Sequence, residues 1–154
     1  MKHAFYFVMI AALCTIFGCG GGGMKPIKTE YIEGKVTYKG QPVAIASLVF
    51  SPVKEGEGHP AYGITDSSGT YRIQTSLGAP GRGTTPGEYI VRISKTEGVP
   101  TGQFSTDPEG NRLAMVNTRH VLPVIYDSAA TSPLRATVTQ GGPNKFDFDL
   151  VDKP

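Results

Sequence analysis

Side chains that could carry out acid–base or nucleophilic chemistry are few and scattered. His59 stands beside a proline in a polar stretch, and His120 ends a long segment that shows no periodicity. The chain contains no Gly-x-Ser-x-Gly sequence of the kind that presents a nucleophilic serine. Its two cysteines, Cys14 and Cys19, both lie near the N-terminus. Because isolated loop histidines are usually solvated, we predict that the protein is not an enzyme.

Oxygen ligands for a cation occur in one short stretch. Asp107, Glu109 and Asn111 alternate with a proline and a glycine. This spacing differs from that of the Asp-x-Asp-x-Asp-Gly calcium loop and is typical of a turn. Asp147 and Asp149 are two residues apart, which places both on the solvent face of a strand. We therefore predict no metal or cofactor, and a calcium site stays as an alternative.

The N-terminus has the features of an export signal. A short basic start is followed by an apolar run, residues 4–17, of about 14 residues. This run is too short to cross a bilayer as a helix but fits the apolar region of a secretory signal. The sequence Ile-Phe-Gly-Cys that ends at Cys19 resembles a bacterial lipobox, and a run of glycines follows it. We expect residues 1–18 to be a signal peptide and residues 19–29 to be a lipidated cysteine and flexible tether.

The lipobox resemblance implies a cellular location as well as a covalent lipid modification. In lipoproteins of this kind the cysteine thiol is diacylated and the new N-terminus is acylated, here at Cys19. Several acyl chains give a stable anchor, whereas one chain binds a membrane only marginally. We therefore expect the bacterial cell envelope as the location, and Gly20 after the cysteine implies the outer membrane in a host with two membranes. The alternatives are an ordinary signal peptide with an incidental cysteine and an apolar N-terminus that is not cleaved.

The charge argues against nucleic acid as a partner. The formal net charge is +2, and loss of Lys2 with the leader leaves 14 basic against 13 acidic residues. Charged residues make up only 18% of the chain and are interspersed. A nucleic-acid binder would show a dense basic face instead.

Alternating patterns dominate the remainder and predict strands. A hairpin over residues 61–73 is the clearest case, because two alternating runs flank the turn sequence Asp-Ser-Ser-Gly. Other strands are expected at 31–39, 43–50 and 88–94, with a closing hairpin formed by 134–139 and 146–150. Residues 122–126 are expected to form a short strand or an edge segment. No stretch shows the apolar stripe of a helix.

About seven strands with one apolar face each predict an all-β domain over residues 30–154. Two stacked antiparallel sheets bury those faces most simply, and an open barrel is the alternative. Some 120 residues suffice for a core without a disulfide.

Three segments together resemble the carboxypeptidase-regulatory-like family: residues 34–43, 63–71 and 86–89. The ending, with Leu-Pro at 122–123, Ser-Pro-Leu at 132–134 and Phe-Asp-Phe-Asp-Leu at 146–150, looks like short bacterial lipoproteins built on that domain. The resemblance implies a transthyretin-like (prealbumin-like) β-sandwich. Such domains serve as accessory or binding modules, so the resemblance implies little about function.

Two further possibilities come with this fold. A hydrolase of the urate pathway shares it, but its Tyr-Arg-Gly-Ser tail is replaced here by Val-Asp-Lys-Pro. Related adhesins form a spontaneous isopeptide bond, for which Lys35, Asn144 or Asp147, and Glu88 are the nearest equivalents by order. Lys35 falls on the polar face of its strand, which disfavours the uncharged buried lysine that this reaction needs.

Recognition is expected at two irregular loops, residues 76–85 and 96–120. Phe104, Met115 and Val116 are candidates for an apolar contact patch, and arginines could grip carboxylates or sulfated sugars. These candidate arginines are Arg82, Arg112 and Arg119. Alternatively, the apolar residues fold back over an open sheet edge. The sequence thus predicts a membrane-anchored, non-catalytic module that binds an envelope protein or polysaccharide; a small envelope hydrolase or calcium-binding protein is the alternative.

Overall fold

A computed structural model describes residues 27–75 and 83–152. This part of the chain contains ten strands, one short 3-10 helix and no α-helix. The strands of the body are β1 (Glu33–Tyr38), β2 (Gln41–Pro42), β3 (Ser47–Pro52), β4 (Ala61–Ile64), β5 (Thr70–Arg72), β6 (Gly87–Ser94), β9 (Arg135–Val138) and β10 (Phe148–Leu150). The remaining elements are β7 (Thr96–Thr106), β8 (Arg112–His120) and the helix η1 (Val124–Tyr126).

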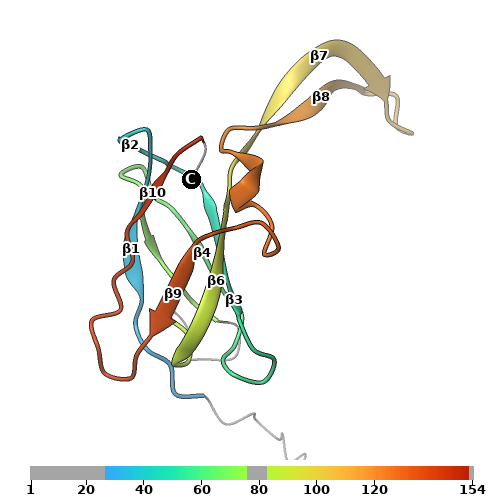
Figure 1. Ribbon diagram of the computed structural model, residues 1–154. Coiled ribbons are helices and arrows are strands. Elements are labelled where there is room, and N and C mark those ends of the chain that lie inside the picture. Colours follow the sequence, from blue (N-terminus) through green and yellow to red (C-terminus); the bar gives the residue numbers. More distant parts are fainter. Residues whose placement is uncertain (1–26, 76–82, 153–154) are drawn as a thin grey trace, which may run out of the picture.

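The body consists of two sheets packed face to face, as Figure 1 shows. One sheet has the order β4-β3-β6-β9 and is antiparallel throughout. In the other, β1 lies between β10 on one side and β2 and β5 on the opposite side. The predicted all-β sandwich is confirmed.

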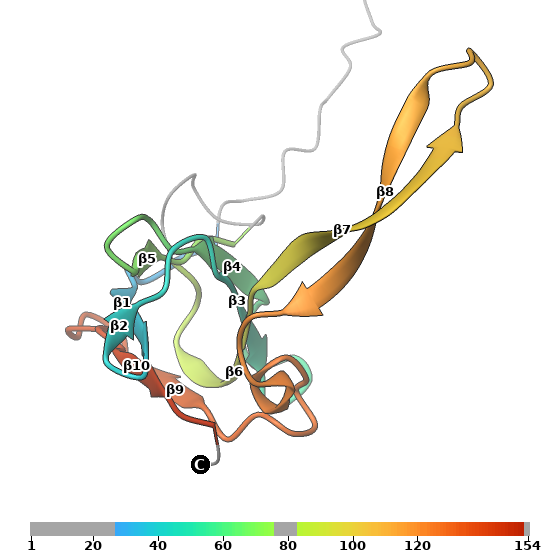
Figure 2. The same cartoon turned by 90° about the horizontal axis from the view of Figure 1, so that it is seen from above.

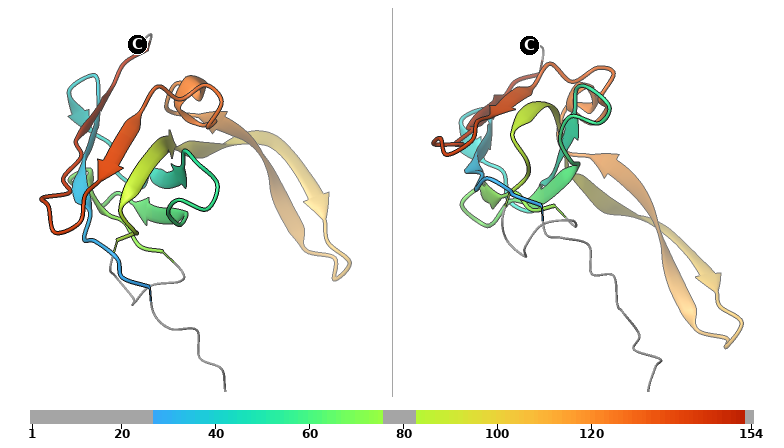
Figure 3. Two further views of the ribbon diagram at one scale, coloured as in Figure 1. Left: turned by 60° about the horizontal axis from the view of Figure 1, so that its bottom comes forward. Right: turned by 90° about the horizontal axis from the view of Figure 1, so that it is seen from below.

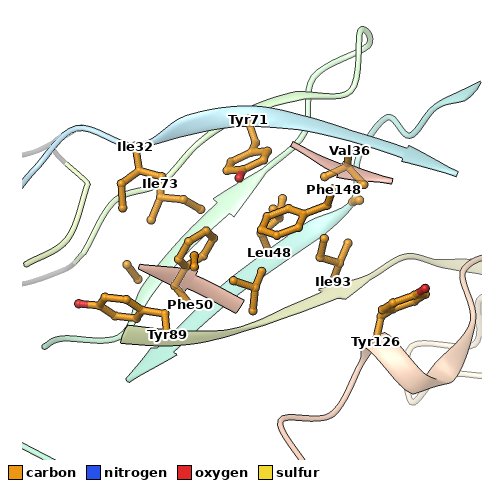
Figure 4. Close-up of a cluster of buried hydrophobic side chains, with 14 of the residues drawn as sticks. Ile32, Val36, Leu48, Phe50, Tyr71, Ile73, Tyr89, Ile93, Tyr126 and Phe148 are labelled. Atoms are coloured by element: carbon orange, nitrogen blue, oxygen red, sulfur yellow. The ribbon is translucent and has the colours of Figure 1, made fainter. Parts of the chain in front are cut away.

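The alternation of apolar residues explains which face of each sheet is buried. Along β3, Leu48 and Phe50 point inward, and along β6 Tyr89, Val91 and Ile93 do so. Successive side chains of a strand point to opposite faces, so one buried parity per strand fills the space between two sheets. Figure 4 shows these side chains meeting in a single cluster.

Three buried tyrosines keep their hydroxyl groups satisfied. Tyr71 donates to the carbonyl of Phe146 (2.6 Å), Tyr89 to that of Thr85 (2.8 Å) and Tyr126 to that of Val151 (3.0 Å). Burial also raises the pKa of the Tyr71 phenol far above its ordinary value. These bonds remove the cost of burying a hydroxyl group and tie loops and chain ends to the core.

The turn predicted at Asp66 to Gly69 is present, and Tyr62 and Gln74 exchange two antiparallel backbone hydrogen bonds beyond it (2.8 and 2.9 Å). The Asp66 carboxylate accepts the Ser68 hydroxyl (2.7 Å) and the backbone N–H groups of Ser68 (2.8 Å) and Thr70 (3.0 Å), which together lower its pKa. Gly69 has a φ of 77°. Yet β4 pairs with β3 whereas β5 pairs with β1. The predicted hairpin is thus present at its turn and at the Tyr62–Gln74 bridge, while its two strands belong to different sheets.

The predicted closing hairpin is wrong. Strand β9 pairs with β6, while β10 runs parallel to β1 in the other sheet. The turn between them is stabilised by Asn144, whose side chain accepts the N–H of Thr139 (2.8 Å) and donates to its carbonyl (2.9 Å). The chain thus crosses between sheets here too.

Residues 122–126 do not form the expected strand. Val124–Tyr126 is a 3-10 helix that follows Pro123 and buries Tyr126. Proline cannot donate to a ladder, and here it precedes the tight turn of the helix.

The largest error concerns residues 96–120, which were expected to be irregular. They form an antiparallel hairpin of β7 and β8 that stands away from both sheets (Figures 1 and 2). Figure 3 shows the same projection from two further directions. Because Gly98, Pro100 and Gly102 interrupt β7, and because neither face is buried, the sequence lacks a period-2 apolar pattern there.

Several expectations lie outside the described residues. These are the signal peptide, Cys19 with most of the tether, and Arg82 with most of the loop 76–85. Among the residues that are described, no helix has the length and apolar character needed to cross a bilayer.

Gly34 gives a direct test of the sheet packing. A Cβ atom built on it would lie 1.8 Å from the carbonyl oxygen of Phe146. We expect Gly34→Ala to lower the free energy of unfolding by about 3 kcal/mol, measured by chemical denaturation, because backbone atoms must move. Gly98→Ala is the control, since its nearest contact would be an ordinary 3.7 Å. Equal stability of the two variants would contradict this packing.

Ile45 gives a second test. Its φ is 56° and its side chain is 75% exposed, so a β-branched residue occupies the left-handed region without burial in return. We expect Ile45→Asn to raise the free energy of unfolding by about 1 kcal/mol, because asparagine tolerates this conformation. Ile64→Asn, at an exposed position in the extended strand β4, should give no gain. Destabilisation by Ile45→Asn would show that this strain is absent.

Candidate functional site

The hairpin formed by residues 96–120, called the arm from here on, is the candidate site. All eleven residues of β7 and all nine of β8 are exposed. A two-stranded hairpin without a hydrophobic face to bury is marginally stable in water. The arm therefore presents both of its faces and both of its edges to other molecules.

A compact turn closes the tip of the arm. The Asp107 carboxylate accepts the backbone N–H of Asn111 (2.7 Å) and its side-chain amide (2.9 Å). Gly110 has a φ of 88° and donates its N–H to the Asp107 carbonyl (3.0 Å). The amide of Asn111 is the main cause of the lowered pKa of Asp107. The residues considered as calcium ligands therefore build the turn.

Within residues 27–75 and 83–152, no three His, Cys, Asp or Glu side chains gather closely enough to hold a metal. The carboxylate of Glu109 belongs to the same tip but takes no part in the hydrogen bonds between Asp107 and Asn111 that close it. The calcium alternative thus gains no support from the geometry of the described residues.

The register of the arm assigns each side chain to a face. Phe104 lies opposite Ala114 and Pro100 lies opposite Val116, with a bulge between these two pairs. Opposed residues share a face in an antiparallel pair, and successive residues alternate. One face therefore carries Phe104, Val116 and Arg112, and we call it the aromatic face.

The guanidinium of Arg112 lies over the ring of Phe104, with its central carbon 4.3 Å from the ring centroid. Phe104 is 54% exposed, so the pair is open to solvent. An arginine stacked on an aromatic ring keeps its N–H donors free at the rim and shields one side of the ring. The pair can therefore accept a planar or anionic group beside an apolar one.

The opposite face of the arm carries Leu113, Met115 and Val99. At the base of the arm, Arg119 is held by Glu97, with 3.1 Å between guanidinium nitrogen and carboxylate oxygen. Exposed pairs of this kind contribute little to stability, but this one occupies the arginine.

The predicted contact residues thus do not all lie on one face of the arm. The structure brings Phe104, Val116 and Arg112 together, turns Met115 to the other face, and engages Arg119 in an ion pair. The alternative that these apolar residues cover an open sheet edge is wrong, because every strand residue of the arm is exposed.

The two loop histidines lie at opposite ends of β6. The His59 carbonyl accepts the Thr84 hydroxyl (2.7 Å) and its N–H reaches the Tyr89 hydroxyl (3.4 Å), both near the start of β6. His120 lies at the base of the arm, 3.9 Å from the Asp127 carboxylate. Since β6 has eight residues, on the order of 25 Å separates these ends, too far for shared chemistry.

The residues considered for an isopeptide bond are not assembled. Lys35 is exposed, and its backbone N–H donates a hydrogen bond to the Asp147 carboxylate (2.8 Å). Glu88 is exposed on the other sheet, opposite Thr137. Asn144 is buried but bonded to Thr139. No buried carboxyl therefore stands beside Lys35 to relay a proton.

A second exposed surface was missed from the sequence. Tyr62 and Ile64 point outward from β4 and border a shallow groove of about 550 Å³, together with Arg72 and Gln74. Their shared parity was visible in the sequence. The sequence did not indicate their exposure, because the inward positions of β4 are the small residues Ala61 and Gly63, which do not mark a buried face.

No protein-family model matches the chain, and no curated protein matches it either. Among solved structures, a 9R-lipoxygenase from Cyanothece PCC8801 matches with a TM-score of 0.35 and 12% sequence identity. That alignment covers 82% of this chain and 18% of the lipoxygenase. A likeness at this level carries no argument about function, and the carboxypeptidase-regulatory-like resemblance stays a prediction.

Proposed function

We propose that the protein is a lipid-anchored, non-catalytic module of the bacterial cell envelope whose arm binds an envelope protein or polysaccharide. The anchor would be acylated Cys19, followed by a glycine-rich tether that lets the sandwich move away from the membrane. The observation that carries the proposal is the complete exposure of the arm.

The composition of the arm supports a role in binding. Five large apolar side chains are exposed on it: Val99, Phe104, Leu113, Met115 and Val116. Scattered exposed apolar residues are normal, but a set gathered on one projecting element is typical of an interaction site. Since the core lies in the body, the arm contributes nothing to it that would explain these residues.

The aromatic face supports the choice of ligand class. An exposed aromatic ring can pack against a sugar ring or an apolar side chain, and an arginine beside it can bind carboxylate or sulfate bidentately. Arginine and aromatic residues are also the types that most often dominate binding energy at interfaces. Phe104 and Arg112 are therefore the residues on which affinity should depend most.

The distance between the histidines supports the non-catalytic part of the proposal. His59 and His120 are held by different ends of β6 and cannot act on one substrate. Each has an ordinary structural neighbour: Thr84 contacts the His59 backbone, and Asp127 lies beside the His120 ring.

The anchor is tested by changing the cysteine. The full-length chain, expressed in a bacterial host, should fractionate with membranes and carry the mass of its acyl chains. Cys19→Ala should move it to the soluble fraction, while Cys14→Ala, in the expected leader, should leave it on the membrane. An unmodified Cys19 thiol on a protein released to the medium would overturn the anchoring.

The arm is tested by binding. The chain from residue 27 onward would be screened against envelope polysaccharides and envelope proteins, with and without Ca²⁺. For any ligand found, we expect Phe104→Ala and Arg112→Ala each to weaken binding about tenfold or more. Thr118→Ala, on the same face nearer the base, should leave the affinity unchanged. Binding that survives both aromatic-face substitutions would place the ligand elsewhere.

A further inference from the structure

The shallow groove beside β4, on the outer surface of the body, has the size of a small-ligand site. Its volume of about 550 Å³ lies within the roughly 300–1,000 Å³ that is typical of such sites. Eight residues line it, whereas each side of a standard protein interface uses roughly 20–30 residues. The groove therefore suits a small molecule or a short piece of a polymer better than a whole protein surface.

The register of the strands brings the side chains of the groove to one face. Tyr62 lies opposite Val49 of β3 and exchanges backbone hydrogen bonds with Gln74. Ile64 lies opposite Ser47. Opposed residues of antiparallel strands share a face, so these side chains all point outward. Neighbouring strands are about 4.8 Å apart, so three strands make the patch roughly 10 Å wide.

The polar side chains of the groove are free to bind a ligand. Among residues 27–75 and 83–152, the side chains of Ser47, Tyr62 and Gln74 form no hydrogen bond. All three residues are exposed. A hydroxyl group or an amide offers both a donor and an acceptor. Such groups match a ligand that is rich in hydroxyl groups.

The charge of the groove does not favour an ion. Among the described residues that line it, Arg72 alone is charged, and Glu33 lies directly opposite Arg72 on β1. Because a carboxylate lies on the neighbouring strand, an anionic ligand gains little from the arginine. The guanidinium still offers its N–H groups as hydrogen-bond donors to a neutral ligand.

Exposed apolar surface lies among these polar groups. Tyr62 is 51% exposed and Ile64 is 66% exposed. Tyr31 adjoins them through Arg72, whose guanidinium carbon lies 6.0 Å from the centroid of the Tyr31 ring. A tyrosine combines an apolar ring with a polar tip. A sugar likewise combines apolar C–H faces with a rim of hydroxyl groups, so the groove can contact both parts at once.

We propose that this groove binds a short segment of a neutral glycan. The ring of Tyr62 packs on the face of a sugar ring, and Ser47, Gln74 and Arg72 form hydrogen bonds with its hydroxyl groups. The small volume favours a short ligand over a protein, and the lack of excess charge favours a neutral one. The free donors and acceptors around an exposed ring favour a sugar over a purely apolar molecule.

This proposal goes beyond the proposed function and does not depend on it. The arm would hold its ligand through Phe104 and Arg112, whereas the groove lies on the body and shares no residue with the arm. Glycan binding at the groove without any binding at the arm, or the reverse, would separate the two proposals.

The test uses the chain from residue 27 onward, because its buried cluster lies between Ile32 and Leu150 and is complete there. Four neutral hexasaccharides are added in turn: cellohexaose, xylohexaose, mannohexaose and maltohexaose. A concentration of about 10 mM nearly saturates a site with a Kd of about 1 mM. We expect at least one of them to shift the backbone amide NMR signals of Tyr62, Ile64 and Gln74 along a saturable curve. Hexagalacturonate, which is anionic, should shift these signals less at the same concentration.

Substitutions in the groove should weaken the binding of that glycan. We expect a loss of about tenfold or more for Tyr62→Ala, which removes the ring, and of about threefold for Gln74→Ala, which removes a hydrogen-bonding group. Gln41→Ala is the matched control, because Gln41 is an exposed glutamine on β2 that does not line the groove. It should leave the affinity unchanged. Unchanged signals of the buried core would show that each variant is folded.

Three results would overturn the proposal. The first is that none of the four neutral glycans shifts the groove signals, or that folded Tyr62→Ala binds as tightly as the parent. The second is tighter binding of hexagalacturonate than of any neutral glycan, which would mean that the groove recognises charge. The third is a shift of the same signals when the protein concentration rises without glycan, which would assign the groove to a second copy of the chain.

Discussion

The packing of Phe50 between the two sheets is the interaction on which the rest of the structure depends. Its ring lies 6.1 Å from that of Tyr89 on its own sheet. From the other sheet and its flanking segment it meets Tyr71, Phe146 and Phe148 at centroid distances of 6.3–6.5 Å. Tilted aromatic pairs at such distances are favourable beyond the area they bury. One side chain of β3 thereby fixes the separation of the two layers.

Because the buried cluster lies entirely within the body, the arm contributes no side chain to it. The arm leaves the end of β6, where Val91–Ser94 pair with β3, so its base is tied to the body while its strands stand in solvent (Figure 2). A rigid scaffold that presents an exposed element is the usual way in which sandwiches carry recognition sites. The side-chain faces of the arm then stand where a ligand can reach them.

The sequence was informative where a residue's own neighbours determine its position. The inward parity of Leu48, Phe50, Tyr89 and Val91 and the turn at Asp66 followed from alternation and local turn chemistry. Which strand pairs with which did not follow. Phe148 alternates in the same way whether β10 pairs with β9 or, as observed, with β1.

The arm could not be predicted from the sequence for a different reason. Apolar periodicity marks a strand only when one face is buried, and Leu113, Ala114, Met115 and Val116 have no buried face. Arg112 and Phe104 were identified as candidates separately, but their stacking requires the hairpin register that places both on one face. The proposed lipid anchor rests on the sequence around Cys19.

The body should fold without help from the arm, because no residue of β7 or β8 is buried. The test replaces residues 97–119 with a short Gly-Asn turn and measures the free energy of unfolding of both chains. We expect the shortened chain to lie within about 0.5 kcal/mol of the parent, because the change removes no buried side chain. A loss of several kcal/mol would show that the arm packs against the body, in contradiction to the structure described here.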